Sequence, residues 1–273
     1  MSTFVIFRTI IELVIEQIHN SFEKIICTNY FKNNIMILTN NLTKKYGDFT
    51  ALHNLNIEIK EGEIFCLLGA NGAGKSTTIN LLLNFIAPTS GVASINGIDI
   101  TKDAKKTKSF LAYIPENLML YPTLTAIENL DYFLGIGGNQ FTKTELEYFL
   151  EEAGLQKEAY HKRIQYFSKG MRQKVGVALA IAKEVKVLLL DEPTSGLDPK
   201  SSNEFGELLK KMKADNVATL MATHDIFRAK EIGTHIGIMK QGELKHQFAN
   251  SDISLQDLEK LYLETMNLKE VRL

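Results

Sequence analysis

The chain has 273 residues, 45% of them apolar, and a formal net charge of −1. This length and composition allow a sizeable core and fit one large domain, or one domain with a small lobe. Because there is no excess of positive charge, non-specific nucleic-acid binding is not expected as the main task. Cys27 and Cys66 are the only cysteines, so the sequence favours a reducing cytosolic compartment, with Cys66 as a core residue.

The first 34 residues differ in character from the rest of the chain. From Phe4 to Ile18, charged residues recur every four positions, which predicts an amphipathic helix and not a membrane span or a secretory signal. We interpret residues 1–34 as a loosely packed extension, or as lying upstream of a true start at Met36. The alternative is a helix that binds a membrane or a partner, in which case truncation before Met36 abolishes turnover or membrane association.

The rest of the chain alternates between strand-like and helical patterns. Strand-like runs occur at 35–39, 54–59, 63–68, 92–95, 110–114, 187–191, 217–222 and 235–239, and helical patterns at 75–84, 125–134, 142–153, 169–183, 200–214 and 255–265. Strands dominate the first section, and helices dominate between Ile114 and Ser168. The pattern predicts an α/β fold around a parallel sheet, preceded by a β-rich section and interrupted by a helical insert.

A glycine-rich loop between a strand-like run and a helical pattern predicts a nucleoside triphosphate site. Glycines allow backbone N–H groups to turn toward phosphates, and the following helix adds the positive end of its dipole. The lysine is expected to reach the terminal phosphates, and the serine hydroxyl to ligate Mg²⁺. The alternative is a turn without a ligand. The loop consists of Gly69, Ala70, Asn71, Gly72, Ala73, Gly74, Lys75, Ser76 and Thr77.

A later strand-like run, at 187–191, ends in the carboxylate Asp191, which Glu192 follows. Ligands of doubly wound sheets bind at the carboxyl ends of the strands, so Asp191 is expected beside the glycine-rich loop, where it can hold Mg²⁺. Glu192 is then placed to polarise a water molecule that attacks the γ-phosphate. The alternative for this acidic pair is a turn with solvated charges.

Ser168 precedes a helix of small apolar residues, in the position of an N-cap. The serine and the free N–H groups of the first turn could bind an anion. On this segment alone, an ordinary capped helix is the favoured interpretation.

Together, these motifs resemble those of the ATP-binding cassette (ABC) ATPases over residues 35–245. The matches follow the family's order: Tyr46 for the aromatic residue that stacks on adenine, 69–77 for Walker A, Glu116 for the Q-loop glutamine, Ser168 and Gly170 for the signature, 188–192 for Walker B, 195–198 for the D-loop and His224 for the switch histidine. The resemblance implies a P-loop NTPase with a mostly parallel central sheet, an N-terminal antiparallel β subdomain and a helical insert at about 115–168. The ATPase domain would span 35–248, and 249–273 would form a helical tail.

The resemblance also implies the ligands and the partners. ATP and Mg²⁺ are expected, with Lys75, Glu192 and His224 as catalytic residues and with Ser76, Asp191 and Glu116 at the metal. Two cassettes pack head to tail in this family, so Ser168 and Gly170 would close on the nucleotide of a second copy. The expected assembly is a homodimer that docks, through its insert and the loop 116–122, on an integral membrane permease at the cytoplasmic face of the membrane, without nucleic acid.

Two departures from the family pattern carry charge. Glu116 replaces a neutral amide, and because a carboxylate can still ligate a metal, Glu116→Gln is expected to stay active beside an inactive Lys75→Ala control. Lys169 and Met171 replace Gly and Gln in the signature, which places a cation at a helix start. This Ser-Lys-Gly-Met form resembles that of subunits paired with exporter-type permeases, so export is favoured over import.

Alternatives to a transporter subunit remain at this point. A soluble ABC-type ATPase acting on ribosomes usually has two cassettes in one chain, and one acting on DNA has a long coiled-coil insert. A small-molecule kinase would leave residues 195–198 and the Ser168 segment unexplained. An idle scaffold would be expected to have lost Lys75 or Glu192, and both are present.

Overall fold

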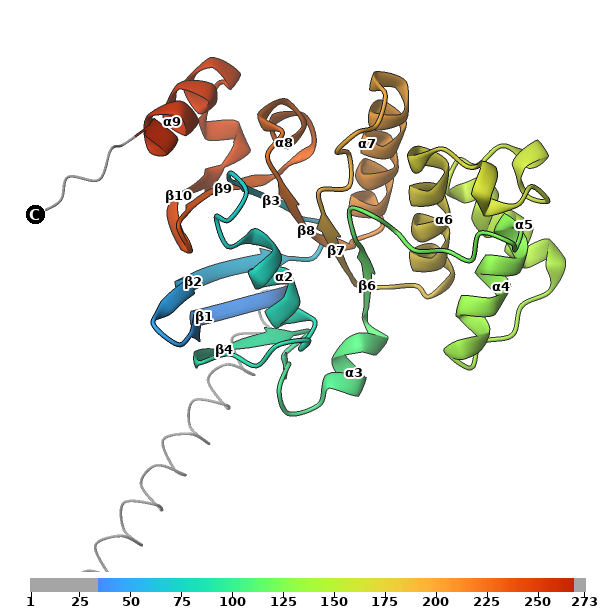
Figure 1. Ribbon diagram of the computed structural model, residues 1–273, viewed down its shortest axis with the longest axis horizontal. Coiled ribbons are helices and arrows are strands. Elements are labelled where there is room, and N and C mark those ends of the chain that lie inside the picture. Colours follow the sequence, from blue (N-terminus) through green and yellow to red (C-terminus); the bar gives the residue numbers. More distant parts are fainter. Residues whose placement is uncertain (1–33, 268–273) are drawn as a thin grey trace, which may run out of the picture.

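The computed structural model describes residues 34–267, so the helix expected at Phe4 to Ile18 and Cys27 lie outside the described residues. Two β-sheets occupy the middle of the molecule, and most helices surround the larger one (Figure 1). Within residues 34–267, no helix combines the length and the apolar character needed to cross a lipid bilayer.

The first sheet is antiparallel and has the strand order β2-β1-β4-β5. Its strands are β1 (Ile35–Tyr46), β2 (Phe49–Lys60), β4 (Ser90–Ile95) and β5 (Ile98–Asp99). The first two strands form a long hairpin in which Tyr46 lies opposite Phe49. The runs predicted at 35–39 and 54–59 are only the apolar parts of these strands, since their exposed polar residues also pair across the hairpin.

The second sheet has six strands in the order β10-β9-β3-β8-β7-β6. Its strands are β3 (Ile64–Leu68), β6 (Leu111–Ile114), β7 (Val187–Asp191), β8 (Ala218–Thr223), β9 (His235–Lys240) and β10 (Glu243–Ala249). All neighbouring pairs are parallel except β9 with β10, which confirms the mostly parallel central sheet.

The α-helices of the described residues are α2 (Lys75–Leu82), α3 (Ala104–Ser109), α4 (Ala126–Ile136), α5 (Lys143–Glu152), α6 (Lys169–Ala182), α7 (Pro199–Ala214), α8 (Ile226–Ile232) and α9 (Leu255–Asn267). All of them begin within one residue of a predicted helix except α3 and α8, which were not predicted. Thr125 and Thr142 each form a capping box with a glutamate three residues later, which fixes where α4 and α5 start. Figure 1 shows α4, α5 and α6 together at one end of the molecule.

The central sheet separates two cores. Along β3, Ile64, Cys66 and Leu68 contribute to a core shared with α4 to α9, whereas Phe65 and Leu67 contribute to a core shared with α2 and the antiparallel sheet. This alternation follows from the two-residue period of a strand buried on both faces. Cys66 is a buried free thiol, as expected of a core residue, and burial raises its pKa.

Candidate functional site

The register of the parallel strands brings the predicted motifs to one edge of the central sheet. Leu68 at the end of β3 pairs with Thr223 of β8, and Asp191 of β7 pairs with Ala222. On the other side of β7, Leu190 pairs with Ile114 at the end of β6. The glycine-rich loop, Glu192, His224 and Glu116 therefore leave the sheet at the same edge, as expected of a ligand site in an open α/β sheet.

A pocket of about 400 Å³ opens at this edge, and we call it the glycine-loop pocket. Most of the predicted site residues line this pocket. Among the residues that the structure describes, the predicted ones that do not line it are Tyr46, Gly69, Ser168, Gly170 and His224. The lining consists of Phe49, Ala51, Ala70, Asn71, Gly72, Ala73, Gly74, Lys75, Ser76, Thr77, Glu116, Asp191 and Glu192.

The glycine-rich loop leaves the start of α2 open to an anion. Gly74 is the N-cap at a φ of 106°, and no side chain caps the helix. A Cβ at Gly74 would lie 3.0 Å from the Ala51 carbonyl oxygen and 3.2 Å from the Gly242 Cα, so only glycine fits. The uncapped N–H groups of the first turn, together with the helix dipole, form the kind of site that binds phosphate.

Lys75 lies almost buried at the mouth of this loop, with 5% of its surface exposed. Its Nζ donates to the carbonyl oxygens of Gly69 at 2.6 Å and Ala70 at 3.3 Å. The same Nζ lies 3.2 Å from Glu192 Oε1, in an ion pair without hydrogen-bond geometry, since Oε1 accepts no hydrogen bond from the described residues. The ammonium group is therefore fixed by the backbone and neutralised by one carboxylate.

Glu192 links Lys75 to His224. Its second oxygen, Oε2, lies 2.8 Å from His224 Nδ1 and accepts a hydrogen bond from the His224 backbone N–H at 3.3 Å. Glu192 has a φ of 49°, a left-handed conformation that is uncommon for a residue other than glycine. A carboxylate held between a cation and an imidazole can accept a proton from water, which is the chemistry of a general base.

Asp191 offers an oxygen to a metal ion. Its Oδ1 is buried without a hydrogen-bond partner among the described residues, and its side chain accepts a hydrogen bond from Ser76. Burial raises the pKa of Asp191, the Ser76 hydrogen bond lowers it, and the Glu192 charge raises it. No group of three or more His, Cys, Asp and Glu side chains within residues 34–267 could hold a metal. One free carboxylate oxygen beside a hydroxyl still fits Mg²⁺, which takes few protein ligands and completes its shell with phosphate and water.

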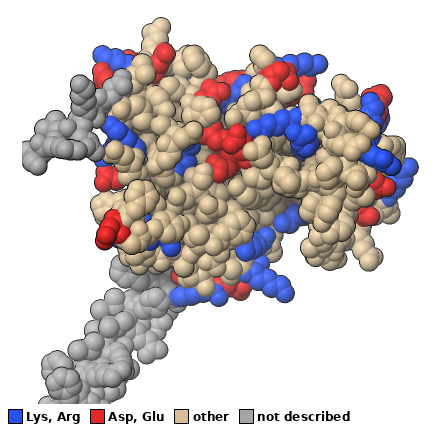
Figure 2. Space-filling model, in the orientation of Figure 1, with Lys and Arg blue, Asp and Glu red and all other residues tan. Residues whose placement is uncertain are grey.

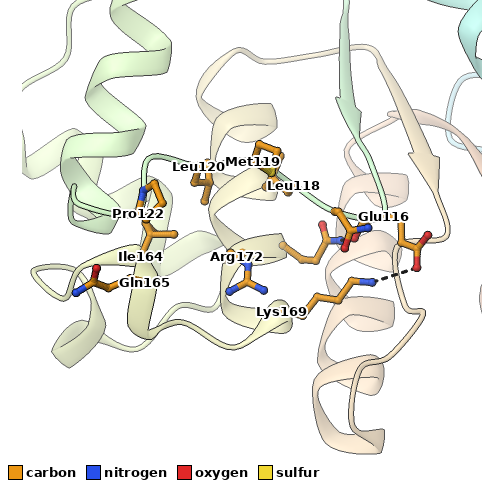
Figure 3. A pocket seen from close by; sticks show the side chains of 11 residues that line it. Glu116, Leu118, Met119, Leu120, Pro122, Ile164, Gln165, Lys169 and Arg172 are labelled. Atoms are coloured by element: carbon orange, nitrogen blue, oxygen red, sulfur yellow. Dashed lines mark hydrogen bonds and ion pairs between the residues drawn. The ribbon is translucent and has the colours of Figure 1, made fainter.

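Glu116 lines two pockets, because it follows β6 where the glycine-loop pocket meets a second cavity. This second cavity, the side pocket, measures about 260 Å³ and lies between the loop 116–122 and the segment Ile164 to Gln173 (Figure 3). Met119, in the loop, is 82% exposed. The structure thus places the loop expected to dock on a partner directly beside the nucleotide site.

The signature segment lies outside the glycine-loop pocket. Ser168 is the exposed N-cap of α6, and its hydroxyl accepts a hydrogen bond from the Met171 N–H at 3.2 Å, which confirms the predicted cap. A Cβ at Gly170 would lie 3.0 Å from the Ser201 side chain, near the start of α7. Asp198 caps that helix by accepting from Ser201 N–H at 3.0 Å. The signature and the D-loop are therefore neighbours within one chain.

The aromatic residue that lines the glycine-loop pocket is Phe49, which the sequence reasoning missed. Tyr46, the residue predicted to stack on adenine, is half exposed, and Lys44 Nζ lies 4.8 Å from the centre of its ring. Tyr46 and Phe49 face each other across the β1–β2 turn. A second aromatic residue three positions after Tyr46 was the available signal.

Comparisons with known proteins agree with this geometry. Residues 52–195 match the ABC transporter family. The chain is 35% identical over 212 residues to the linearmycin resistance ATP-binding protein LnrL of Bacillus subtilis, covering 77% of this chain and 68% of LnrL. It is 39% identical over 210 residues to the bacitracin transport ATP-binding protein BcrA of Bacillus licheniformis, covering 77% of this chain and 68% of BcrA.

A solved structure has the same fold. A dimeric ATP-binding cassette in a post-hydrolysis state, bound to ADP and Pi, is similar to this chain with a TM-score of 0.70 and 30% sequence identity. The match covers 79% of this chain and 99% of that one. The family match at residues 52–195 includes the strand, loop and helix order on which the glycine-loop pocket is built.

Proposed function

This chain belongs to the ABC transporter family, and we propose that its ATP hydrolysis powers a membrane exporter. It is an ATP-binding and ATP-hydrolysing subunit of that family. The observation that carries the proposed mechanism is the chain of contacts from Lys75 through Glu192 to His224 at the mouth of the glycine-loop pocket.

The proposed reaction is an attack of water on the γ-phosphate of ATP. The N–H groups at the start of α2 and the Lys75 ammonium group hold the phosphates. Phosphate oxygens compete with Glu192 for Lys75, because both are anions, and a carboxylate released from Lys75 is a better proton acceptor. His224 keeps the Glu192 carboxylate oriented toward the attacking water. When bound by Ser76 and Asp191, with Glu116 close by, Mg²⁺ would neutralise phosphate charge.

We propose that the working unit is a head-to-tail homodimer. The support is that Ser168 and Gly170 lie outside the glycine-loop pocket and that Ser168 is exposed, which leaves the start of α6 accessible to the nucleotide of a second copy. The similar solved cassette is dimeric. ATP binding would favour the closed dimer and hydrolysis the open one, because the two states differ in their affinity for ATP.

The proposed partner is an integral membrane permease, with the ATPase bound at its cytoplasmic face. Support comes from the side pocket and the exposed Met119 beside it, an apolar surface next to the nucleotide site. The similar proteins LnrL and BcrA are named for linearmycin resistance and for bacitracin transport, which favours export as the direction.

The test is to isolate the tagged full chain from the membranes of its own host. We expect a polytopic membrane protein to co-purify, and Met119→Asp to reduce that association because it puts a charge on the docking surface. Phe85→Asp is the matched control, since Phe85 is 61% exposed but follows α2, away from the side pocket. Co-purification of ribosomes or DNA in place of a membrane protein would favour the soluble ABC-type ATPase.

A further inference from the structure

One face of α6 holds the loop that follows β6. Lys169, Gln173 and Gly176 lie four and three residues apart, so they share that face. Gln173 Nε2 donates to the carbonyl oxygens of Pro115 at 3.3 Å and Glu116 at 3.4 Å. The signature helix and the loop that carries Glu116 are thus connected directly.

At the first position of this face, Lys169 forms an ion pair with Glu116. The Lys169 Nζ lies 3.6 Å from Glu116 Oε1, and the dashed line in Figure 3 marks this contact. The Lys169 side chain is 21% exposed and that of Glu116 is 47% exposed. The two charges are the two departures from the family pattern, and in the fold they face each other.

The charges around the glycine-loop pocket indicate the role of this ion pair. Its lining contains three carboxylates, from Glu116, Asp191 and Glu192, but only one lysine, Lys75. The negative charge of Glu116 is one of the causes that raise the pKa of Asp191, after burial and the charge of Glu192. Figure 2 shows Asp and Glu side chains gathered near the middle of this face, with Lys and Arg side chains beside them toward the helical insert.

We infer that Lys169 is a positioning residue of the nucleotide site in its own chain, which holds the Glu116 carboxylate toward α6 and offsets its charge. A triphosphate carries several negative charges, so an unpaired Glu116 at the pocket opposes its binding. The ion pair also offsets the unfavourable placement of a cation at the start of α6. The inference rests on the proposed nucleotide site.

A double-mutant cycle tests this inference on the full-length chain, with a fluorescent ATP analogue as the probe. Binding is titrated in EDTA at protein concentrations where sedimentation shows a monomer, so that a second copy cannot contribute. Lys169→Gln is expected to weaken binding roughly two- to fivefold, the range of a partly exposed ion pair. In a Glu116→Gln background, the same change should have no effect, because there is no charge left to offset.

Added Mg²⁺ should shrink the Lys169→Gln effect, because a divalent cation screens the same carboxylate. Lys169→Arg should bind like the unmodified chain, since it keeps the charge. Lys174→Gln is the matched control: it removes a lysine from the same helix and an ion pair with Glu204, but lies outside both pockets. Its nucleotide affinity should not change.

The possible outcomes distinguish a failure of this inference from a failure of the proposed nucleotide site. An equal effect of Lys169→Gln with and without Glu116, or no effect in either background, would overturn the inference while leaving the site intact. Lys75→Ala should abolish binding in every background. Retained binding in Lys75→Ala would overturn the proposed site and this inference with it.

Discussion

Glu192 is constrained on three sides. Lys75 and His224 hold its two oxygens at 3.2 and 2.8 Å, and its backbone adopts a left-handed φ of 49°. Such a conformation costs a non-glycine residue about 1 to 3 kcal/mol and persists only where the surrounding structure enforces it. Here the hydrogen bond from Glu192 N–H to the Ala222 carbonyl oxygen, at 2.9 Å, ties the residue to the end of β8. The fold therefore loses some conformational stability at Glu192 but gains a fixed orientation of the Glu192 carboxylate.

Glu192→Gln is expected to lower the rate of ATP hydrolysis by about 10²- to 10⁴-fold, because an amide cannot accept the proton of the attacking water. ATP binding should persist, since Lys75 loses an anionic competitor of the phosphates. Phosphate release and titration with a fluorescent ATP analogue measure the two effects. Glu184→Gln is a matched control, because Glu184 has the same φ of 49° but is exposed after α6. Unchanged turnover in Glu192→Gln would contradict its assignment as the base.

His224→Ala should also abolish hydrolysis while ATP binding persists. The substitution removes the 2.8 Å imidazole contact and leaves Glu192 with Lys75 and the longer backbone N–H contact at residue 224, so the carboxylate is held less firmly at the position of the attacking water. We expect a fall in turnover of about 100-fold or more at saturating ATP. His161→Ala is the control, because the His161 side chain is 60% exposed and that of His224 is 56% exposed. Turnover like that of the control would exclude a role for the imidazole.

At the scale of elements, the strands and helices predicted from the sequence were correct where an element is buried on one face or on all sides. The apolar run 187–190 was recognisable as a strand because a strand buried between two cores consists mostly of apolar residues. β10 was missed because it is an edge strand of mixed polarity, and α3 and α8 because they are too short to show a helical period. Helices α4 and α5 start one residue after Thr125 and Thr142, where their predicted runs began, because those two residues are the N-caps.

Whether a site residue could be predicted depends on whether it lies at the end of a recognisable strand. The glycine-rich loop and the acidic pair were predictable because each lies at the end of a parallel strand, and parallel strand ends share one edge. Glu116 was predicted through the family resemblance. The pairing of Glu116 with Lys169 depends on how the loop after β6 packs on α6, 53 residues further along the chain. No local pattern encodes that approach. For Phe49 a local signal existed, the second aromatic residue three positions after Tyr46, but the sequence does not tell which of these two paired residues lines the pocket.

The close approach of β4 to β1 leads to a prediction about the stability of the antiparallel sheet. Gly91 has a φ of +78°, and a Cβ there would lie 2.2 Å from the Asn41 carbonyl oxygen. Gly47 has a φ of +56° and no atom within 4 Å of an added Cβ. Gly91→Ala should therefore lower the free energy of unfolding by about 3 kcal/mol, and Gly47→Ala by only about 1 kcal/mol. Urea unfolding of the two variants measures both values, and equal losses would contradict the close strand approach.

At the scale of the whole molecule, the proposed homodimer uses two different surfaces of one chain. The glycine-loop pocket offers the phosphate-binding loop and the base, whereas Ser168 is exposed at the start of α6, outside that pocket. A single copy can therefore bind ATP without enclosing it. In the proposed homodimer a second copy completes the enclosure, so the specific ATPase activity is expected to rise with protein concentration.

ATP should convert the Glu192→Gln chain from monomer to dimer, because nucleotide binds but is not hydrolysed. Adding Ser168→Arg should keep the chain monomeric while its ATP binding persists, since a bulky side chain then blocks the surface that closes on the other copy's phosphates. Sedimentation with and without ATP measures the change, and Ser251→Arg, at an exposed position after β10, is the matched control. A dimer that forms equally well with Ser168→Arg would show that the two copies meet through a different surface.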